Sequence, residues 1–199
     1  MKNTFLEAVK DRRSYYAINK EVAISDECIL EIINHAVFYA PSAFNSQSAR
    51  IVILLGSQHE TLWNIAKDTL KKIIDPNRFA VTEEKINGFA NGYGTVLFFE
   101  NMATVQKLQN EFSLYKDNFP IWSHHASGML QYIVWTAMES EGLGASLQHY
   151  NPLIDDEVKK TWNVPADYKL IAQMPFGNPV KIPEEKEHIP VSERVKLYK

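Results

Sequence analysis

The sequence contains one long apolar stretch that has the period of a helix. Residues 121–141 predict a helix that ends where Gly142 and Gly144 follow. Its most continuous apolar part, Ala126 to Met138, is well short of the ~20 residues that a membrane span needs and contains polar residues. The stretch therefore predicts a buried helix, and no membrane is expected as a partner.

Shorter runs of branched and aromatic residues predict buried strands. These runs cover Arg50 to Leu55, Thr95 to Phe99, Leu143 to Leu147 and Lys169 to Pro175. Further helices are expected over 3–12, 58–74, 83–90, 102–115 and 154–162, and from Ser25, which caps a helix, to Pro41, which stops it. Helices and strands mixed irregularly, rather than in strict alternation, predict an α+β fold and not a doubly wound one.

Composition limits the classes of function. The 199 residues carry 45% hydrophobic and 23% charged residues and a net charge of -3, so no global basic field exists to bind nucleic acid. Without repeats or linkers, residues 1–199 are expected to form a single domain. The lone Cys28 favours a reducing compartment and a buried thiol, and the N-terminus lacks the apolar core of a signal peptide. The protein is expected to be cytoplasmic.

The last stretch, residues 178–199, differs from the rest of the chain. It contains three prolines and many charges, and too little apolar surface to pack on its own body. We expect it to be an extended C-terminal arm that crosses a partner subunit.

The segment Arg12-Arg13-Ser14 follows the first helix and is the first candidate site. Two guanidiniums and a hydroxyl offer the donors that a phosphate monoester requires. Alternatively, adjacent arginines at this position simply form a solvated cap at the C-terminal end of a helix.

Two further segments are rich in polar or small residues. The loop at 40–47 contains Asn45 and Gln47, whose amides suit a heterocycle with imide and carbonyl edges, although an ordinary polar turn would look similar. In the segment at 142–150, small residues allow backbone N–H groups to approach a flat ligand. This segment is also compatible with a helix stop followed by a buried strand.

In this order, the three segments resemble the nitroreductase family, most closely a branch of fungal and bacterial proteins whose motif ends in LQHY. The resemblance rests on RRS, APSxxNSQ, WSHHASGMLQ, GLGASLQHYNP and MPFGNPV, which cover most of the chain from Asp11 to Pro179. It implies a nitroreductase fold with a central mixed, mainly antiparallel sheet flanked by helices. It also implies a homodimer with two FMN sites at the subunit interface and exchanged C-terminal arms.

The resemblance also implies roles for individual residues. Arg12 and Ser14, with Arg13 beside them, match residues that hold the FMN phosphate, and Lys186 matches the basic residue that completes this cluster. The segment that contacts the ribityl chain and ring corresponds to Pro41, Ser42, Asn45 and Gln47. The stretch along the isoalloxazine, which offers a backbone N–H to the flavin N5, corresponds to Ala145, Ser146, Leu147 and Gln148.

The implied activity is hydride transfer from NADH or NADPH through flavin N5 to nitroaromatic or quinone-type acceptors, by a ping-pong mechanism. No catalytic side chain is required because the flavin carries the redox chemistry. The nicotinamide cofactor would be a transient substrate, since the chain has neither a P-loop nor a dinucleotide-binding glycine motif. Aromatic residues that could stack with flat acceptors are Phe44, Trp122 and Tyr150.

Other interpretations remain open at this point. His124 and His125, with His149, suggest a metal, but neighbouring helical residues point about 100° apart, so no metal is expected. A flavin-binding sensor or stress-response protein with little turnover would use the same contacts. Residues 76–94 and 110–122 are the best candidates for a lid over a specialised substrate.

Overall fold

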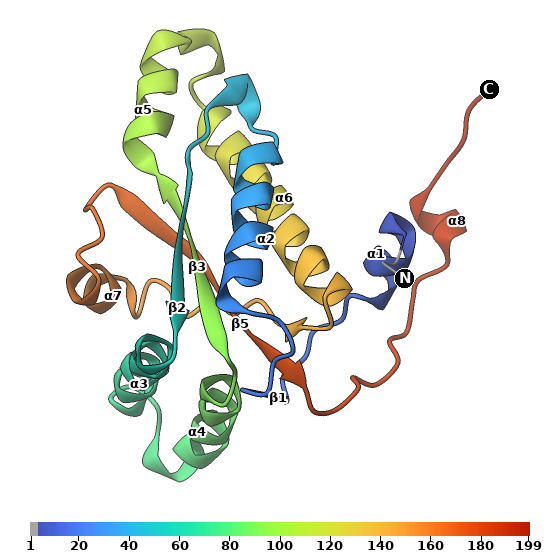
Figure 1. Ribbon diagram of the computed structural model, residues 1–199. Helices are drawn as coiled ribbons and strands as arrows, with labels where there is room; N and C mark the ends of the chain where they lie inside the picture. Colours follow the sequence, from blue (N-terminus) through green and yellow to red (C-terminus); the bar gives the residue numbers. More distant parts are fainter. Residues whose placement is uncertain (1–3) are drawn as a thin grey trace.

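The computed structural model describes residues 4–199 and has helices on both faces of one antiparallel sheet (Figure 1). The strands are β1 (Ile18–Asn19), β2 (Ala49–Leu55), β3 (Gly94–Asn101), β4 (Gly144–Ala145) and β5 (Tyr168–Pro179). They lie in the order β1-β5-β3-β2, and β4 also pairs with β5. Every strand pair is antiparallel, and an isolated bridge between Ser14 and Ala145 is parallel. The predicted α+β class and mainly antiparallel sheet are confirmed.

The α-helices mostly coincide with the apolar patterns of the sequence. They are α1 (Phe5–Asp11), α2 (Asp26–Tyr39), α3 (Ser57–Lys71), α4 (Pro76–Ala90), α5 (Met102–Glu111), α6 (Phe119–Ser140), α7 (Asp155–Thr161) and α8 (Val191–Arg194). Short 3-10 turns cover Ala43–Asn45 and Ser113–Tyr115. The helix expected at 121–141 is α6, and no helix among residues 4–199 has the length and apolarity that a membrane crossing requires.

Several sequence expectations need correction. The first helix was expected from residue 3, which lies outside the described residues; α1 starts at Phe5. The helix expected at 83–90 starts at Pro76 because Asp75 caps it and proline suits the first helical position. The helix expected to 115 ends at Glu111 and is followed by a 3-10 turn. Cys28 is half-buried rather than buried, because it lies in the first turn of α2.

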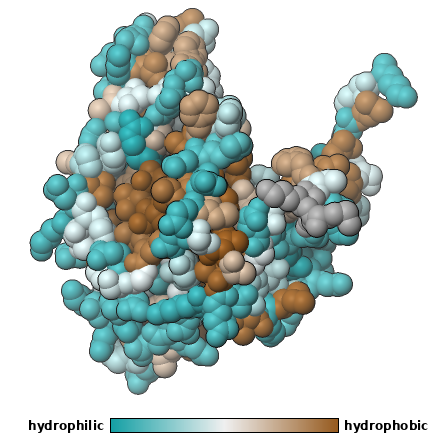
Figure 2. All heavy atoms as spheres, in the orientation of Figure 1, coloured by the Kyte–Doolittle hydropathy of each residue, from teal (hydrophilic) through white to brown (hydrophobic). Residues whose placement is uncertain are grey.

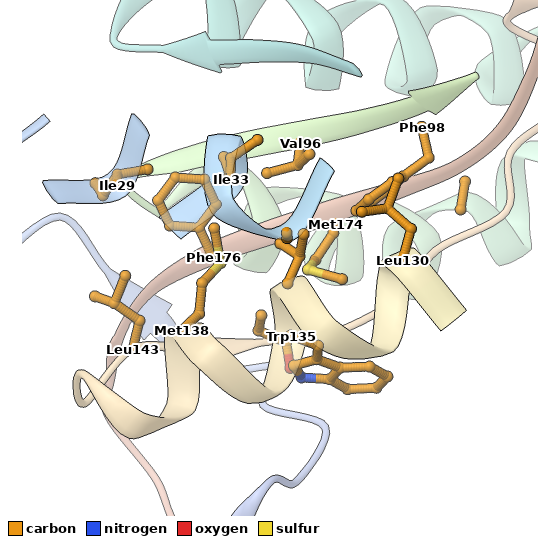
Figure 3. Packing of buried hydrophobic residues seen from close by; sticks show 14 residues of the cluster. Ile29, Ile33, Val96, Phe98, Leu130, Trp135, Met138, Leu143, Met174 and Phe176 are labelled. Carbon is orange, nitrogen blue, oxygen red and sulfur yellow. The ribbon is translucent and has the colours of Figure 1, made fainter. Parts of the chain in front are cut away.

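Alternate residues of β3 supply the core on the two faces of the sheet. Val96 and Phe98 pack with α2 and α6, whereas Leu97 and Phe99 pack with α3 and α4. Figure 3 shows the first of these clusters, with Trp135 of α6 at its edge and apart from Ile33 of α2. The period of two along the strand therefore explains why helices cover both faces.

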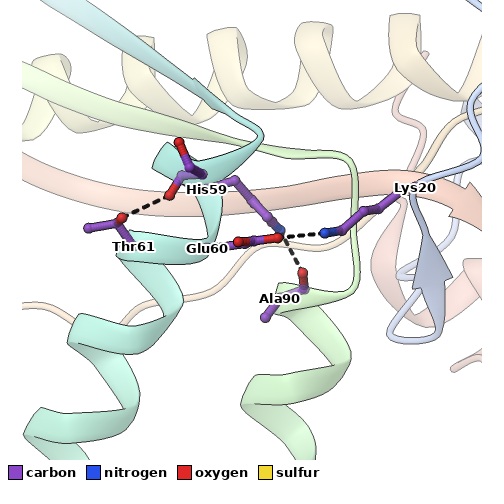
Figure 4. A network of polar contacts seen from close by, with 6 residues as sticks. Lys20, His59, Glu60, Thr61 and Ala90 are labelled. Carbon is purple, nitrogen blue, oxygen red and sulfur yellow. Dashed lines mark hydrogen bonds and ion pairs between the residues drawn. The ribbon is translucent and has the colours of Figure 1, made fainter.

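A buried histidine joins α3 to the sheet and to α4. His59, which is 1% exposed, donates through Nε2 to the Ala90 carbonyl at 3.2 Å (Figure 4). Its Nδ1 accepts from Thr95 Oγ1 at 2.8 Å. The Trp63 indole N–H donates to the same Thr95 oxygen at 3.0 Å. All these bonds are satisfied when the imidazole is neutral, and burial lowers the pKa of His59 to about 4.

This histidine predicts an acid-sensitive fold. Because the folded pKa lies below the unfolded value of about 6.5, the stabilisation is complete above pH 6.5 and is lost as the pH falls toward 4. We expect the loss at pH 4.5 to be on the order of 2–3 kcal/mol relative to pH 7. His59→Gln keeps a donor and an acceptor but does not titrate. Urea unfolding at both pH values gives the free energy of unfolding of each protein. The difference in this free energy between the wild type and the variant should be smaller at pH 4.5 than at pH 7. A pH-independent gap would contradict this interpretation.

The C-terminal segment and strand β2 leave surfaces of the chain uncovered. After Val180, whose N–H donates to the Ala17 carbonyl, nearly the whole segment is exposed and runs past α1 away from the body (Figure 1). Strand β2 pairs with β3 on one side only, and its outer edge has no partner strand among residues 4–199. Figure 2 shows a brown, apolar area on this face where β2 lies, and Ile51 and Ile53 are only half-buried.

Candidate functional site

Two of the predicted segments meet at the end of α1. The Tyr15 N–H donates to the Ala145 carbonyl at 2.9 Å, which places Ser14 beside Ala145 in the parallel bridge. Strand β4 is held in turn by β5, so the Arg-Arg-Ser segment is anchored to the central sheet. The sequence separates these segments by 130 positions, and the fold brings them into direct contact.

The C-terminal segment completes a small cationic pocket beside this bridge. The pocket has a volume of about 380 Å³, and its lining includes Arg13, Ser14, Lys181 and Lys186. Arg13 donates through Nη2 to the carbonyl of Glu184, which fixes the segment against α1. The structure therefore brings the predicted residues Arg13, Ser14 and Lys186 together, and it adds Lys181, which the sequence analysis did not identify.

Arg12 lies at the other side of this segment, against α6. Its guanidinium carbon is 4.3 Å from the centroid of the Trp135 ring and 5.9 Å from that of Tyr132. The Nε atoms of both Arg12 and Arg13 are buried without a hydrogen-bond partner among the described residues. Buried donors of this kind normally have a partner, so the unpaired atoms indicate a ligand for this segment.

A larger groove continues from the cationic pocket toward α4. The two cavities share Tyr16 and Ala17, and the groove has a volume of about 1050 Å³. Asn87 of α4 and Asn91, the residue that caps the C-terminal end of α4, contribute amide groups to its lining. Neither residue was predicted from the sequence, because single asparagines in or beside a helix carry no motif.

The backbone after β4 pairs with β5 along one edge only. Every second backbone N–H of this stretch donates to β5. The N–H groups of Ser146 and Gln148 donate to the carbonyls of Pro175 and Gln173, respectively. The N–H of Tyr150 donates to Oε1 of the Gln173 side chain. The intervening N–H groups have no partner among residues 4–199; they belong to Leu147, His149 and Asn151. An open edge with several unpaired donors therefore follows the Ser14 bridge.

The side chains of this stretch do not all face that edge. Ala145 and Ser146 are fully buried and Gln148 is 6% exposed, whereas Leu147 is half-buried and His149 exposed. The structure thus makes Leu147 and His149 more accessible to a ligand than three of the four residues predicted from the sequence.

The loop after α2 has a constrained backbone. Phe44, Asn45 and Gln47 have φ values of 55°, 50° and 47°, which non-glycine residues seldom adopt. The Ser42 side chain accepts the Gln47 N–H at 3.0 Å and so holds the turn. A segment under this kind of strain is typical of a ligand contact.

This loop lines a pocket of its own. Pro41, Ser42, Asn45 and Gln47 contribute to a cavity of about 650 Å³ that also contacts Ala126 of α6. Trp135, which contacts Arg12, lies nine residues further along α6, or about 13 Å along the helix axis. A single chain therefore holds the loop and the cationic pocket as two separate partial sites.

Phe44 of the strained loop belongs to a cluster of aromatic side chains that is partly exposed. Phe44 is stacked on Trp122 with ring centroids 6.2 Å apart and planes inclined by 17°. The rings of Phe112, Tyr115 and Phe119 also pack on Phe44. Phe44 and Trp122 line a cavity of about 390 Å³ with His125.

Tyr150, the third predicted pocket residue, lies elsewhere. It packs on Trp63 with ring centroids 5.8 Å apart, in the core between the sheet and α3. Its side chain points to this core because the neighbouring Gln148 and Tyr150 backbones are bonded to β5. The structure does not bring Tyr150 together with Phe44 and Trp122.

The sequence profile of the nitroreductase family matches residues 9–178, which contain the loop pocket and the Arg-Arg-Ser segment but not Lys181 and Lys186. This chain belongs to the nitroreductase family. The yeast Saccharomyces cerevisiae has two related proteins: HBN1 is 32% identical over 190 residues, covering 94% of this chain and 93% of its own length. The nitroreductase FRM2 is 30% identical over 187 residues, covering 93% of each. The family expected from the sequence motifs is confirmed.

Solved nitroreductases share the fold. The nitroreductase CinD from Lactococcus lactis in complex with chloramphenicol is 42% identical, with a TM-score of 0.91 over 98% of this chain and 100% of that chain. Its complex with 4-nitrophenol gives a TM-score of 0.90 with the same identity and coverage. A Desulfitobacterium hafniense nitroreductase with bound FMN is 18% identical with a TM-score of 0.71, covers the whole of both chains, and shows the common fold alone. The predicted nitroreductase fold is confirmed.

A buried carboxyl adjoins the Arg-Arg-Ser segment of this nitroreductase. Glu139 of α6 lies 3.5 Å from the Tyr15 hydroxyl through Oε1, and its Oε2 is buried without a hydrogen-bond partner in the described chain. The pKa of Glu139 is raised to about 7, first by burial and then by the nearby Asp11, although the Tyr15 hydroxyl and Arg12 act in the opposite direction. The group therefore changes charge near neutral pH.

Glu139 predicts a stability difference that depends on pH. Because its folded pKa lies above the unfolded value of about 4.3, the folded state is favoured in acid, and this advantage disappears as the pH rises to about 7. Glu139→Gln cannot ionise, so we expect it to match the wild type at pH 5 and to unfold roughly 3 °C higher at pH 8. Thermal unfolding at both pH values checks this. If the two proteins differ in unfolding temperature by the same amount at pH 5 and pH 8, Glu139 does not titrate in this range.

Proposed function

We propose that this chain is an FMN-dependent oxidoreductase that passes hydride from NADH or NADPH to nitroaromatic or quinone-type acceptors. The observation that carries the proposal is the contact between Ser14 and Ala145. Through it, the cationic pocket and the open backbone edge become parts of one site. A phosphate group and a flat ring joined by a flexible chain require these two features side by side.

The cationic pocket fits the phosphate of FMN. Arg13, Lys181 and Lys186 supply positive charge, and Ser14 supplies a short hydroxyl donor. The buried Nε of Arg13, which lines the pocket, lacks a partner that a phosphate could provide. Arg12 does not line this pocket in the single chain and would reach the phosphate from beside it. The cationic pocket, with a volume of about 380 Å³, admits the phosphate. The adjoining groove of about 1050 Å³ gives space for a larger ring system.

The open edge fits the isoalloxazine ring. Unpaired N–H groups of Leu147, His149 and Asn151 can donate to ring acceptor atoms without breaking the pairing with β5. Asn87 and Asn91 offer further amides in the adjoining groove, whose lining does not include this edge. Fixed donors of this kind favour negative charge that develops on the ring, because they need no reorganisation during the reaction.

Bound FMN supplies one chemistry, the uptake and release of hydride at its N5. The chain orients the ring through its backbone donors and leaves one ring face accessible to donors and acceptors in turn. A nicotinamide cofactor would bind there transiently, and an acceptor would follow it, which gives ping-pong turnover. No side chain needs to act as a nucleophile in this scheme, and the proton that completes reduction of the acceptor would come from water.

We further propose that two copies of the chain complete each site. The strained loop with Asn45 and Gln47 lines a pocket separate from the phosphate pocket, so a second copy would bring the two together. The exposed C-terminal arm and the unpaired edge of β2 support an exchange of arms. Val195 has extended backbone angles and alternates with Leu197 as an exposed apolar side chain, a pattern typical of an added strand.

The aromatic cluster supports a flat acceptor. Phe44 is 52% exposed although its ring stacks on Trp122, so a planar ring could pack on it without unfolding the loop. CinD, which is 42% identical, has been solved with 4-nitrophenol, a nitroaromatic compound. The shared fold and the exposed aromatic rings make small nitroaromatics the first acceptors to test.

The test uses the FMN-loaded protein under nitrogen. We expect NADH or NADPH to bleach the yellow flavin absorption and 4-nitrophenol or a quinone to restore it, with steady-state kinetics of the ping-pong type. Bleaching without recovery by either acceptor would contradict the proposed acceptors. If neither nicotinamide bleaches the flavin, the oxidoreductase activity is wrong and a flavin-binding role without turnover replaces it.

A further inference from the structure

One side chain contacts both segments of the proposed phosphate and ring site. The indole of Trp135 stacks on the Arg12 guanidinium, with 4.3 Å between the guanidinium carbon and the ring centroid. Its Nε1 donates to the Ala145 carbonyl at 3.2 Å, and this carbonyl also accepts the Tyr15 N–H. Trp135 is 9% exposed, so both contacts are largely shielded from water.

A stacked aromatic ring holds an arginine in a different way than a carboxylate partner does. A carboxylate would occupy the N–H fork of the guanidinium, whereas an aromatic face attracts the cation and fixes its plane while its N–H donors stay available. The Arg12 Nε is buried with no partner in the described chain, whereas its Nη atoms are not buried and form no hydrogen bond there, so they are the donors that remain for a ligand. Glu139, one turn further along α6, has a pKa of about 7 and so is only partly charged at neutral pH.

The second contact fixes the position of the backbone. The Ala145 carbonyl receives donors from Tyr15 on one side and from Trp135 on the other. Residues after Ala145 then run along β5 and leave their alternate N–H groups unpaired. A change at Trp135 would therefore affect the distance between the phosphate pocket and the ring edge.

We propose that Trp135 is a positioning residue that orients Arg12 toward the phosphate of FMN and sets the place of Ala145 beside it. The inference rests on the proposed binding of FMN. A positioning role differs from a purely structural role in one respect. If Trp135 acts through Arg12, the loss of Trp135 should weaken FMN binding in the wild type but should have no further effect where Arg12 is already replaced.

The experiment measures the Kd of FMN by flavin fluorescence for wild type, Trp135→Leu, Arg12→Leu and the double variant. We expect Trp135→Leu to weaken FMN binding about 10-fold, because a desolvated cation–π contact is lost. In the Arg12→Leu background the same change should alter the Kd by less than about 2-fold. Riboflavin lacks the phosphate, so its Kd should also change by less than about 2-fold.

Two further variants guard against a folding artefact. Trp135→Phe keeps an aromatic face and most of the core volume, and we expect it to bind FMN within about 3-fold of wild type. Trp162→Leu is the matched control, because its indole N–H also forms a hydrogen bond, to Gln58 at 2.8 Å, but far from Arg12 in the fold. It should leave the Kd of FMN unchanged.

The outcomes separate the two levels of the proposal. If the wild type takes up no FMN, the proposed function itself fails. If the wild type binds FMN and Trp135→Leu binds it equally well, Trp135 has no positioning role. The inference is also overturned if Trp135→Leu weakens FMN and riboflavin equally, or if its full effect persists in the Arg12→Leu background.

Discussion

Replacing Arg12 with leucine is expected to weaken FMN binding by about 30- to 100-fold, because a charge-assisted hydrogen bond to phosphate contributes about 2–3 kcal/mol. Leucine keeps apolar contact with Trp135, so the fold of the segment should persist. The effect should depend on the phosphate: the Kd of riboflavin should change little. Flavin fluorescence titrations with FMN and with riboflavin measure both Kd values for the wild type and the variant.

The control for this prediction is Arg78→Leu, which removes an exposed arginine of α4 that lines none of the pockets described above. It changes the net charge by the same amount and should leave both affinities unchanged. An Arg12→Leu variant that binds FMN as tightly as wild type would exclude Arg12 from the phosphate site.

Removal of residues 188–199 is expected to abolish both the dimer and FMN retention. The deletion removes the exposed apolar residues in the last part of the arm but keeps Val180, Ile182, Lys186 and the Arg13–Glu184 contact. The residues it removes include Ile189, Val191, Val195, Leu197 and Tyr198, which are 60–85% exposed in the single chain. Such side chains gain roughly 1.5–3 kcal/mol each when fully buried in a partner, enough to decide the association.

Sedimentation of the shortened and the full-length protein at the same concentration measures the dimer, and the absorption of retained flavin measures the site. The double variant Val195→Asp and Leu197→Asp keeps the full length and should give the same two losses, because charges oppose burial against the edge of β2. Glu193→Gln and Lys196→Gln, on the same arm, are the matched controls and should dimerise normally. A shortened chain that remains dimeric with FMN bound would contradict arm exchange.

The sequence allowed a good prediction of the elements that depend on local pattern. Period and caps placed α2 and α6 within about two residues, and glycines marked the end of β2 and the start of β3. The two-residue strand β1 was missed because a pair of residues has no measurable period. The first turns of α4 were missed although Asp75 and Pro76 form a readable start signal.

The candidate site was predictable only as separate segments. The three motifs carry their chemistry locally, but their distance from one another depends on strand pairing that no motif encodes. Tyr150 illustrates the limit: an aromatic residue after a strand can face either side, and the bond of its N–H to Gln173 fixes its side chain in the core. Asn87 and Asn91 join the groove only because α4 packs beside Tyr16 and Ala17.

The amount of FMN per chain in the purified protein tests the proposed site without any variant. We expect this site to give a yellow protein with flavin absorption, a native mass of two chains, and about one FMN released per chain on heating. A colourless protein that takes up no added FMN would contradict this expectation, and so would FMN bound in full amount to a monomer, because one chain holds the two parts of the site in separate pockets.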